Sequence, residues 1–148
     1  MVSGGFGLSF DHLGLASRDP DATLKFLRGL GYDTPASVHD PLQSANLVYC
    51  THPTMPAVEV IYAGEDPGPL DAILSAKPTD IYHQCYRSAD RQHTLAAIKA
   101  AGHRVVLVSA PKPAVLFGGL PVSFHLVKGF GLIEIIEDPS AASSFVQP

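Results

Sequence analysis

The chain has 148 residues, of which 46% are hydrophobic and 16% charged, so it has enough apolar material for one packed domain and too little charge for a disordered protein. Its net charge of −4 argues against a nucleic-acid partner, because phosphate binding needs a basic surface. No apolar run reaches the roughly 18 residues of a membrane span, and residues 1–10 lack the regions of a secretory signal. We expect a cytoplasmic protein without a membrane partner, in which Cys50 and Cys85 are buried thiols.

The first predicted strand is "FDHLGLAS" at residues 10–17, where apolar and polar residues alternate. A helix is expected to follow, with Asp19 as its N-cap and Pro20 at its first position. Gly29 or Gly31 is expected to end this helix. Three further strands are predicted near residues 37–38, at 44–50 and at 57–63.

The second half of the chain repeats this order. A strand is predicted over residues 82–88, and a helix follows with Ser88 or Asp90 as its cap and Gly102 as its stop. The linker at 64–80 is rich in proline and contains one short predicted helix, and the tail at 138–148 is expected to be loose. Three further strands are predicted at 103–109, 122–128 and 131–137.

The two halves match at one constant offset, because His12 and His83 lie 71 residues apart and five more identities share that spacing. The other identical pairs are Ser17 and Ser88, Asp19 and Asp90, Thr23 and Thr94, Leu24 and Leu95, and Gly31 and Gly102. We expect an α+β fold of two βαβββ modules, at about 8–63 and 81–137, packed around a pseudo-twofold axis within one domain.

Two histidines and two glutamates form the candidate site. His12 and His83 lie in the equivalent first strands, and Glu59 and Glu134 lie in the last strands, each among apolar neighbours. A carboxylate is costly to bury unless it is paired or binds a cation. The four residues together therefore predict a site for one divalent ion, and such ligands suit zinc, nickel, cobalt, manganese and iron(II) alike.

Two further residues are candidate substrate contacts. His125 lies in the predicted strand 122–128, and by alternation we expect it to face the same cavity. Lys112 lies in a proline-rich segment beside the Gly118–Gly119 pair, which suits a loop over the cavity mouth, and its ammonium group suits an anionic substrate group. The remaining histidines are expected in solvent or at caps: His39, His52, His93 and His103.

These residues resemble the vicinal oxygen chelate superfamily, which includes glyoxalase I, methylmalonyl-CoA epimerase, extradiol dioxygenases and bleomycin-resistance proteins. The resemblance implies a half-open eight-stranded barrel around one metal, with His12, Glu59, His83 and Glu134 as ligands. It also implies that Glu134 acts as the base that removes a substrate proton, and Glu59 is the alternative. The similar stretches are "DHLGLASRDPDATLKFLRGLGYD", "VEVIYAGEDPGPLDAIL", "YHQCYRSAD" and "GLIEIIE".

One position departs from the epimerase pattern, in which a catalytic glutamate precedes a glutamine. If Gln43 aligns with that glutamine and contacts substrate, Leu42 occupies the glutamate position. Leucine cannot take a proton, so a one-base reaction is easier to support than a two-base epimerisation.

The expected function is a metal-dependent lyase or isomerase that polarises a carbonyl and removes the adjacent proton, on an acyl thioester or a related small acid. One alternative is a non-catalytic protein of the same fold that binds a small molecule. Another is a non-haem iron dioxygenase, which the fourth protein ligand disfavours. The resemblance also makes a homodimer possible.

Overall fold

The computed structural model describes residues 5–144, which divide into two compact units. The first unit is His12–His83, and the second combines Met1–Asp11 with Gln84–Pro148. Within the described residues, no helix is long and apolar enough to cross a membrane.

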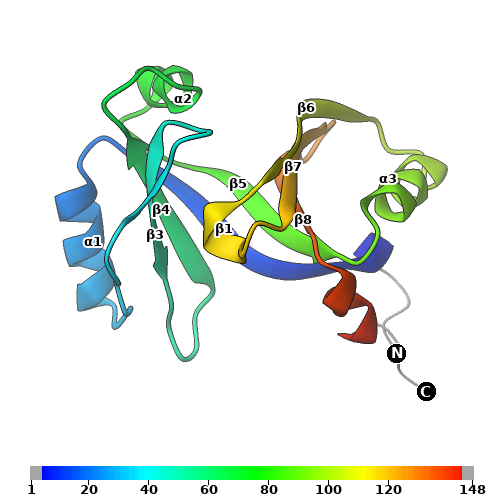
Figure 1. Cartoon of the computed structure of the whole chain (residues 1–148), viewed down its shortest axis with the longest axis horizontal. Coiled ribbons are helices and arrows are strands. Elements are labelled where there is room, and N and C mark those ends of the chain that lie inside the picture. Colours follow the sequence, from blue (N-terminus) through cyan, green and yellow to red (C-terminus); the bar gives the residue numbers. More distant parts are fainter. Residues whose placement is uncertain (1–4, 145–148) are drawn as a thin grey trace. The chain divides into compact units, whose positions relative to one another are not determined.

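The first unit contains the helices and strands β1 (Leu8–Ser17), α1 (Pro20–Gly29), β2 (Val38–Asp40), β3 (Ala45–Cys50), β4 (Ala57–Ala63) and α2 (Leu70–Ala76). Its strands are ordered β2-β3-β4-β1, and only the β4–β1 pair is parallel. Strand β1 begins in the second unit and crosses into the first. Helix α1 lies beside β4 (Figure 1) and forms a core with its strands. The buried members of this core are Leu27, Tyr32, Val48, Cys50, Val58 and Val60.

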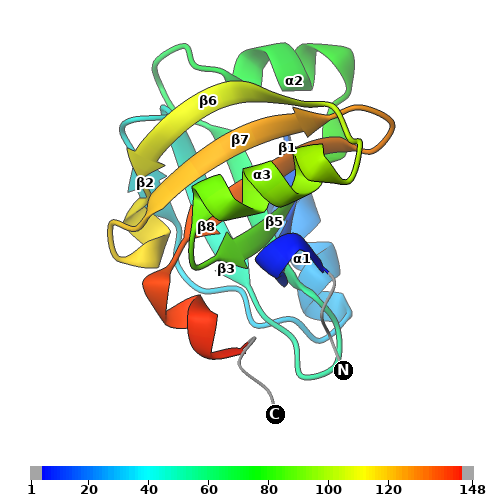
Figure 2. The same cartoon turned by 90° about the vertical axis from the view of Figure 1, so that its right-hand side faces the viewer.

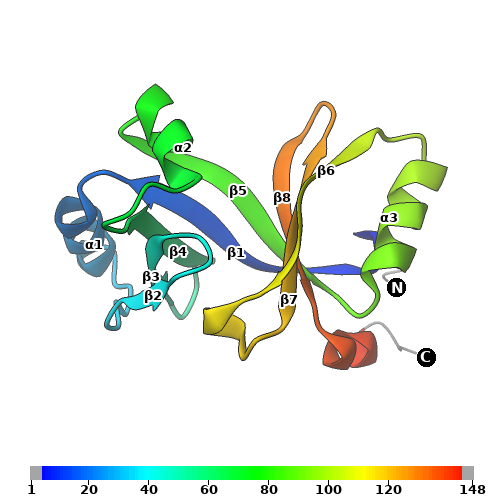
Figure 3. The same cartoon turned by 45° about the horizontal axis from the view of Figure 1, so that its top comes forward.

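The second unit contains η1 (Gly5–Gly7), β5 (Thr79–Ser88), α3 (Arg91–Ala100), β6 (Val105–Pro113), η2 (Val115–Phe117), β7 (Pro121–Val127), β8 (Gly131–Glu137) and η3 (Pro139–Ser144). Its strands are ordered β5-β8-β7-β6, and only the β5–β8 pair is parallel. Strand β5 crosses from the first unit into the second. Helix α3 lies across one face of this sheet (Figure 2), and η2 joins the long antiparallel strands β6 and β7 (Figure 3).

The repeated residues build the same strand–helix corner in both units. The hydroxyl oxygens of Ser17 and Thr23 lie 2.8 Å apart, as do those of Ser88 and Thr94. Each serine also accepts a hydrogen bond from the backbone N–H of the aspartate that caps the next helix. These shared contacts explain why serine, aspartate and threonine recur in the sequence at this spacing.

The structure confirms the predicted α+β fold with two βαβββ modules. Both helix caps also agree, since the Asp19 carboxylate accepts a hydrogen bond from Ala22 N and the Asp90 carboxylate accepts one from His93 N. Both cysteine thiols are buried and form no disulfide. The tail differs from the prediction, because Asp138 pairs with Arg87 and residues 139–144 form the 3-10 helix η3; residues 145–148 lie outside the described residues.

Candidate functional site

Three buried ionisable side chains meet in the first unit. His12 on β1, Glu59 on β4 and His83 on β5 are at most 4% exposed, and each offers a ligand atom within 4.8 Å of the others. His12 Nε2 lies 3.7 Å from Glu59 Oε1, and the two imidazole rings are 5.6 Å apart with a 76° angle between their planes. Two imidazoles and one carboxylate, all withdrawn from water, fit a divalent metal such as zinc.

The parallel pairing of β1 and β4 positions two of these groups. Gly14 lies opposite Glu59 in the sheet, and His12 is two residues earlier on the same face of β1. Tyr49 lies opposite Glu59 on β3, and its ring meets the His12 ring edge to face at 5.5 Å. Strand pairing and aromatic packing therefore fix the orientations of His12 and Glu59.

Gly14 is a site residue that the sequence interpretation missed. A Cβ atom at this position would lie 2.1 Å from Cε1 of His83 and 2.4 Å from its Nδ1. The His83 imidazole therefore occupies the space that any other residue at position 14 would fill. A glycine inside a strand is a sign of such close approach, but it does not identify the approaching group.

Glu134 lies in the second unit and is 4% exposed. It lies opposite Cys85 in the parallel β5–β8 pair, and Cys85 is two residues after His83. Gly14 is likewise two residues after His12 and lies opposite Glu59. Glu134 thus has the same strand position in its module as Glu59 has in the other.

His125 does not share the face of Glu134. The strand partner of Glu134 on β7 is Phe124, so the next residue, His125, points to the opposite face. There the His125 ring lies 2.8 Å from the Ser123 hydroxyl, and both residues are at most 1% exposed. Burial, with a smaller contribution from the positive charge of Arg91, lowers the pKa of His125. The expectation that His125 faces the cavity of Glu134 is therefore wrong, and we do not propose it as a substrate contact.

Gln43 lies in the turn between β2 and β3. Its side-chain amide donates a 2.8 Å hydrogen bond to the Asp40 carboxylate, which also accepts a 3.0 Å bond from Leu42 N. The Leu42 side chain is 55% exposed, so the position aligned with the epimerase glutamate lies at the surface of this turn. The Gln43 amide supports the turn, and its contact with substrate stays a prediction.

Lys112 is exposed on β6 opposite Val122, whose own partner on β8 is Ile136. This register places Lys112 on the same face as Glu134, two strands away. The position is compatible with the predicted contact to an anionic substrate group, which stays a prediction.

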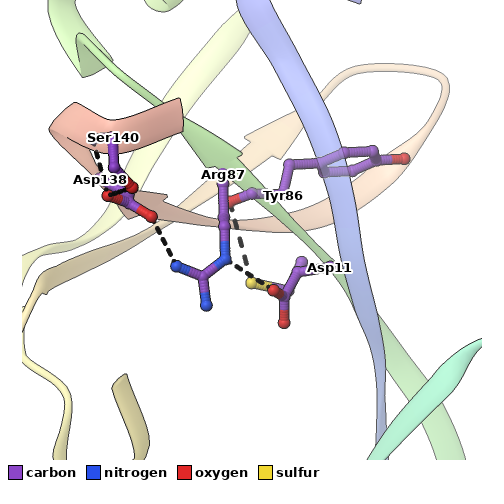
Figure 4. Close-up of polar contacts among 6 residues, drawn as sticks. Asp11, Tyr86, Arg87, Asp138 and Ser140 are labelled. Carbon is purple, nitrogen blue, oxygen red and sulfur yellow. Dashed lines mark hydrogen bonds and ion pairs between the residues drawn. The ribbon is translucent and has the colours of Figure 1, made fainter. Parts of the chain in front are cut away.

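Arg87 also lies on the Glu134 face, opposite Ile136, and is fully engaged in the second unit (Figure 4). Its Nε donates a 2.8 Å hydrogen bond to Asp11, and its Nη1 donates a 2.7 Å bond to Asp138. Its guanidinium carbon lies 5.5 Å from the centre of the Phe117 ring. Two carboxylates surround one cation, so this cluster has a net negative charge.

A pocket of about 330 Å³ lies in the first unit, but it is separate from the buried histidines. It opens where β1 and β4 end, and Arg18, Tyr62 and Leu74 are among its lining residues. His12, Glu59 and His83 do not line it, so we assign it no part in the candidate chemistry.

Comparisons with known proteins agree with this architecture. The family model of the Glyoxalase/Bleomycin resistance protein/Dioxygenase superfamily matches residues 11–124, while no curated protein gives a significant match. Methylmalonyl-CoA epimerase from Mycobacterium tuberculosis is similar in structure, with a TM-score of 0.71, 18% identity and 97% of each chain covered.

Two other solved structures are also similar. Hypothetical protein BH1468 from Bacillus halodurans C-125 has a TM-score of 0.72 at 17% identity, with 88% of this chain and 94% of that chain covered. A variant of Streptomyces coelicolor methylmalonyl-CoA epimerase, in complex with 2-nitronate-propionyl-CoA, has a TM-score of 0.62 at 20% identity, with 86% and 94% covered. At these identities the likeness concerns the fold.

Proposed function

Because the chain belongs to the glyoxalase/bleomycin resistance protein/dioxygenase superfamily, we propose that it is a metal-dependent isomerase or lyase that removes the proton beside a substrate carbonyl. The observation that carries this proposal is the buried group of His12, Glu59 and His83, whose donor atoms suit one divalent ion. The equivalent strand positions of Glu59 and Glu134 support Glu134 as a fourth ligand.

The bound ion would polarise the carbonyl and stabilise the negative charge that develops on its oxygen, a contribution of several kcal/mol. The two histidines would contribute neutral nitrogen ligands. Burial of the two glutamates would keep water from competing for the ion and would strengthen each electrostatic interaction in the site.

We assign proton abstraction to Glu134, with Glu59 as the alternative, because these carboxylates are the bases in the proposed site. A base must lie within about 3 Å of the proton it removes, or act through one water molecule. The exposed Leu42 supplies no second base, which favours proton exchange or isomerisation at one face of the substrate over a two-base epimerisation.

An acyl thioester is the substrate class that we propose. The similar Streptomyces coelicolor enzyme was solved with 2-nitronate-propionyl-CoA, and another methylmalonyl-CoA epimerase was solved with methylmalonyl-CoA. On this chain, Lys112 is a candidate for the anionic part of such a carrier, since it lies on the Glu134 face.

The first test is metal content, measured by mass spectrometry on protein purified without chelator or nickel resin. We expect about one divalent ion per chain, and its loss in the His12→Ala/Glu134→Ala double variant. His93→Ala is the matched control, because His93 is exposed on α3 and lies outside the buried group. An ion content unchanged in the double variant would refute the site.

The second test is incorporation of deuterium beside the carbonyl of methylmalonyl-CoA and propionyl-CoA in D₂O. The metal-loaded protein should catalyse this exchange, and Glu134→Gln should abolish it. Tight binding of both thioesters without exchange would instead identify a binding protein of this fold.

A further inference from the structure

One end of the Glu134 face is covered in part by a loop of the same unit. On this face Arg87, Ile136 and Val122 form a row of strand partners, and Ile136 and Val122 are at most 5% exposed. Phe117 and Leu120, from the loop between β6 and β7 (Figure 3), pack against the buried cluster that contains Val122 and Ile136. The loop therefore covers Ile136 and Val122, while Lys112, the next strand partner in this row, stays exposed on β6.

The opposite end of the same face is open and apolar. Leu132, Leu126 and Val106 are successive strand partners on β8, β7 and β6. Leu126 is 47% exposed and Val106 is 48% exposed, and Phe130 in the adjoining turn is 59% exposed. We name these four residues the apolar shelf. Exposed apolar side chains that cluster in this way mark binding surfaces more often than scattered ones do.

The shelf directly adjoins the candidate site. Leu132 is two residues before Glu134 on β8, so the two side chains point to the same face about 7 Å apart along the strand. A substrate whose carbonyl lies at Glu134 can therefore extend one end along β8 onto the shelf, while its other end extends toward Lys112.

Charge also distinguishes the two directions. The four shelf residues are apolar, and the cations Lys128 and Arg104 follow them at the end of the β6–β7 pair. Arg87, at the partly covered end, is held by Asp11 and Asp138, and this cluster is negative overall (Figure 4). The shelf residues therefore suit a hydrocarbon chain, whereas the exposed cation Lys112 suits the anionic carrier.

We propose that the apolar shelf binds an extended hydrocarbon chain of the substrate, so that the protein acts on medium- or long-chain acyl thioesters in preference to short-chain ones. This inference rests on the proposed function, which places the reacting carbonyl at Glu134. The shelf would hold the acyl chain beyond the reacting carbon, and Lys112 remains available to the carrier end of the molecule.

Adjacent residues on β6 supply a matched pair of variants. Val106 belongs to the shelf, whereas Leu107 is the strand partner of His125 and points to the opposite face. The two are similarly exposed, at 48% and 54%, so lysine is tolerable at either position. Val106→Lys and Leu107→Lys thus place the same charge on opposite faces of one strand.

Calorimetry on the zinc-loaded chain would measure the affinity for propionyl-, hexanoyl- and decanoyl-CoA. We expect the dissociation constant to fall by about two- to fourfold for each added methylene group, the gain that burial of hydrocarbon provides. Leu107→Lys should keep this dependence on chain length, and Val106→Lys and Leu126→Lys should lose it. Equal affinities across the series for the unaltered chain, or an unchanged dependence in both shelf variants, would overturn the proposal.

Two further measurements separate the possible failures. If the chain-length dependence is present but no thioester exchanges its proton in D₂O, the proposed reaction fails while the apolar binding surface stands. Sedimentation of the same variants would detect a second copy of the chain on the shelf. Conversion of a dimer to monomers by Val106→Lys, with the chain-length dependence intact, would refute the inference and assign the shelf to a subunit interface.

Discussion

Substitution of Gly14 by alanine should remove His83 from the proposed metal site and leave the fold largely in place. The new Cβ would lie 2.1 Å from Cε1 of His83, where ordinary van der Waals contact begins at 3.4 Å. The imidazole must therefore move by about 1.3 Å, because Gly14 lies in a paired strand that cannot yield. Metal–ligand distances tolerate only about 0.2 Å, so His83 would no longer bind.

Loss of a ligand should weaken zinc binding by more than about 100-fold, since even a change beside a ligand costs 10- to 100-fold. The overpacking itself should lower the free energy of unfolding by about 1–3 kcal/mol in the absence of metal. Competition with a fluorescent chelator measures the affinity, and urea unfolding in EDTA measures the stability.

Gly29→Ala is the control for this experiment. Apart from its chain neighbours and the backbone of its own helix, no atom lies within 4 Å of a Cβ at Gly29, so this variant should bind zinc as the unaltered chain does. If Gly14→Ala binds zinc with an affinity within threefold of that of the unaltered chain, either the position of His83 or its role as a ligand is refuted.

Three other predictions concern titratable groups. Burial lowers the pKa of His125, so as the pH falls the imidazole is protonated in the unfolded chain before it is protonated in the folded chain. The free energy of unfolding should therefore decrease as the pH falls below about 6.5. Urea titrations with EDTA should show a less steep decrease for His125→Gln. Hydrogen bonds from Ser140 and Arg87 lower the pKa of Asp138 in the folded chain. Its contribution to the free energy of unfolding should therefore be present above about pH 4 and be lost as the pH falls through the lower pKa of the folded state. At pH 7, Asp138→Asn should cost about 1 kcal/mol, whereas Asp80→Asn, in an exposed pair, should cost less than about 0.5 kcal/mol. Burial raises the pKa of the Cys50 thiol to about 11, so a thiol reagent at pH 8 should modify it only after urea is added.

The fold was predictable because its signals are local. Alternation located most strands, and Asp19 with Pro20 located the start of α1. Phe26 shows the limit of these local signals, since it is as apolar as its neighbour Leu27 in α1, yet it is 70% exposed while Leu27 is buried. A single strand of the sheet covers little of the helix surface, and sequence spacing cannot show how far that cover extends.

The site was predictable only where the repeat constrained it. The repeat paired His12 with His83 and suggested the equivalence of Glu59 and Glu134, which the strand registers now support. The face occupied by His125 depends on the register of β7 against β8, which is set by the turn between them rather than by alternation within one strand.

The boundaries of the two compact units do not coincide with the two sequence repeats. Residues 8–11 of β1 group with the second repeat, and residues 79–83 of β5 group with the first. A cut in the connecting segment would therefore give two fragments, each lacking a piece of strand that its partner carries. Such fragments should fold only when mixed, with kinetics that depend on concentration. In a tandem fusion of two first repeats, the opening strand of each repeat would have to pair in the sheet of the other repeat before either sheet is complete.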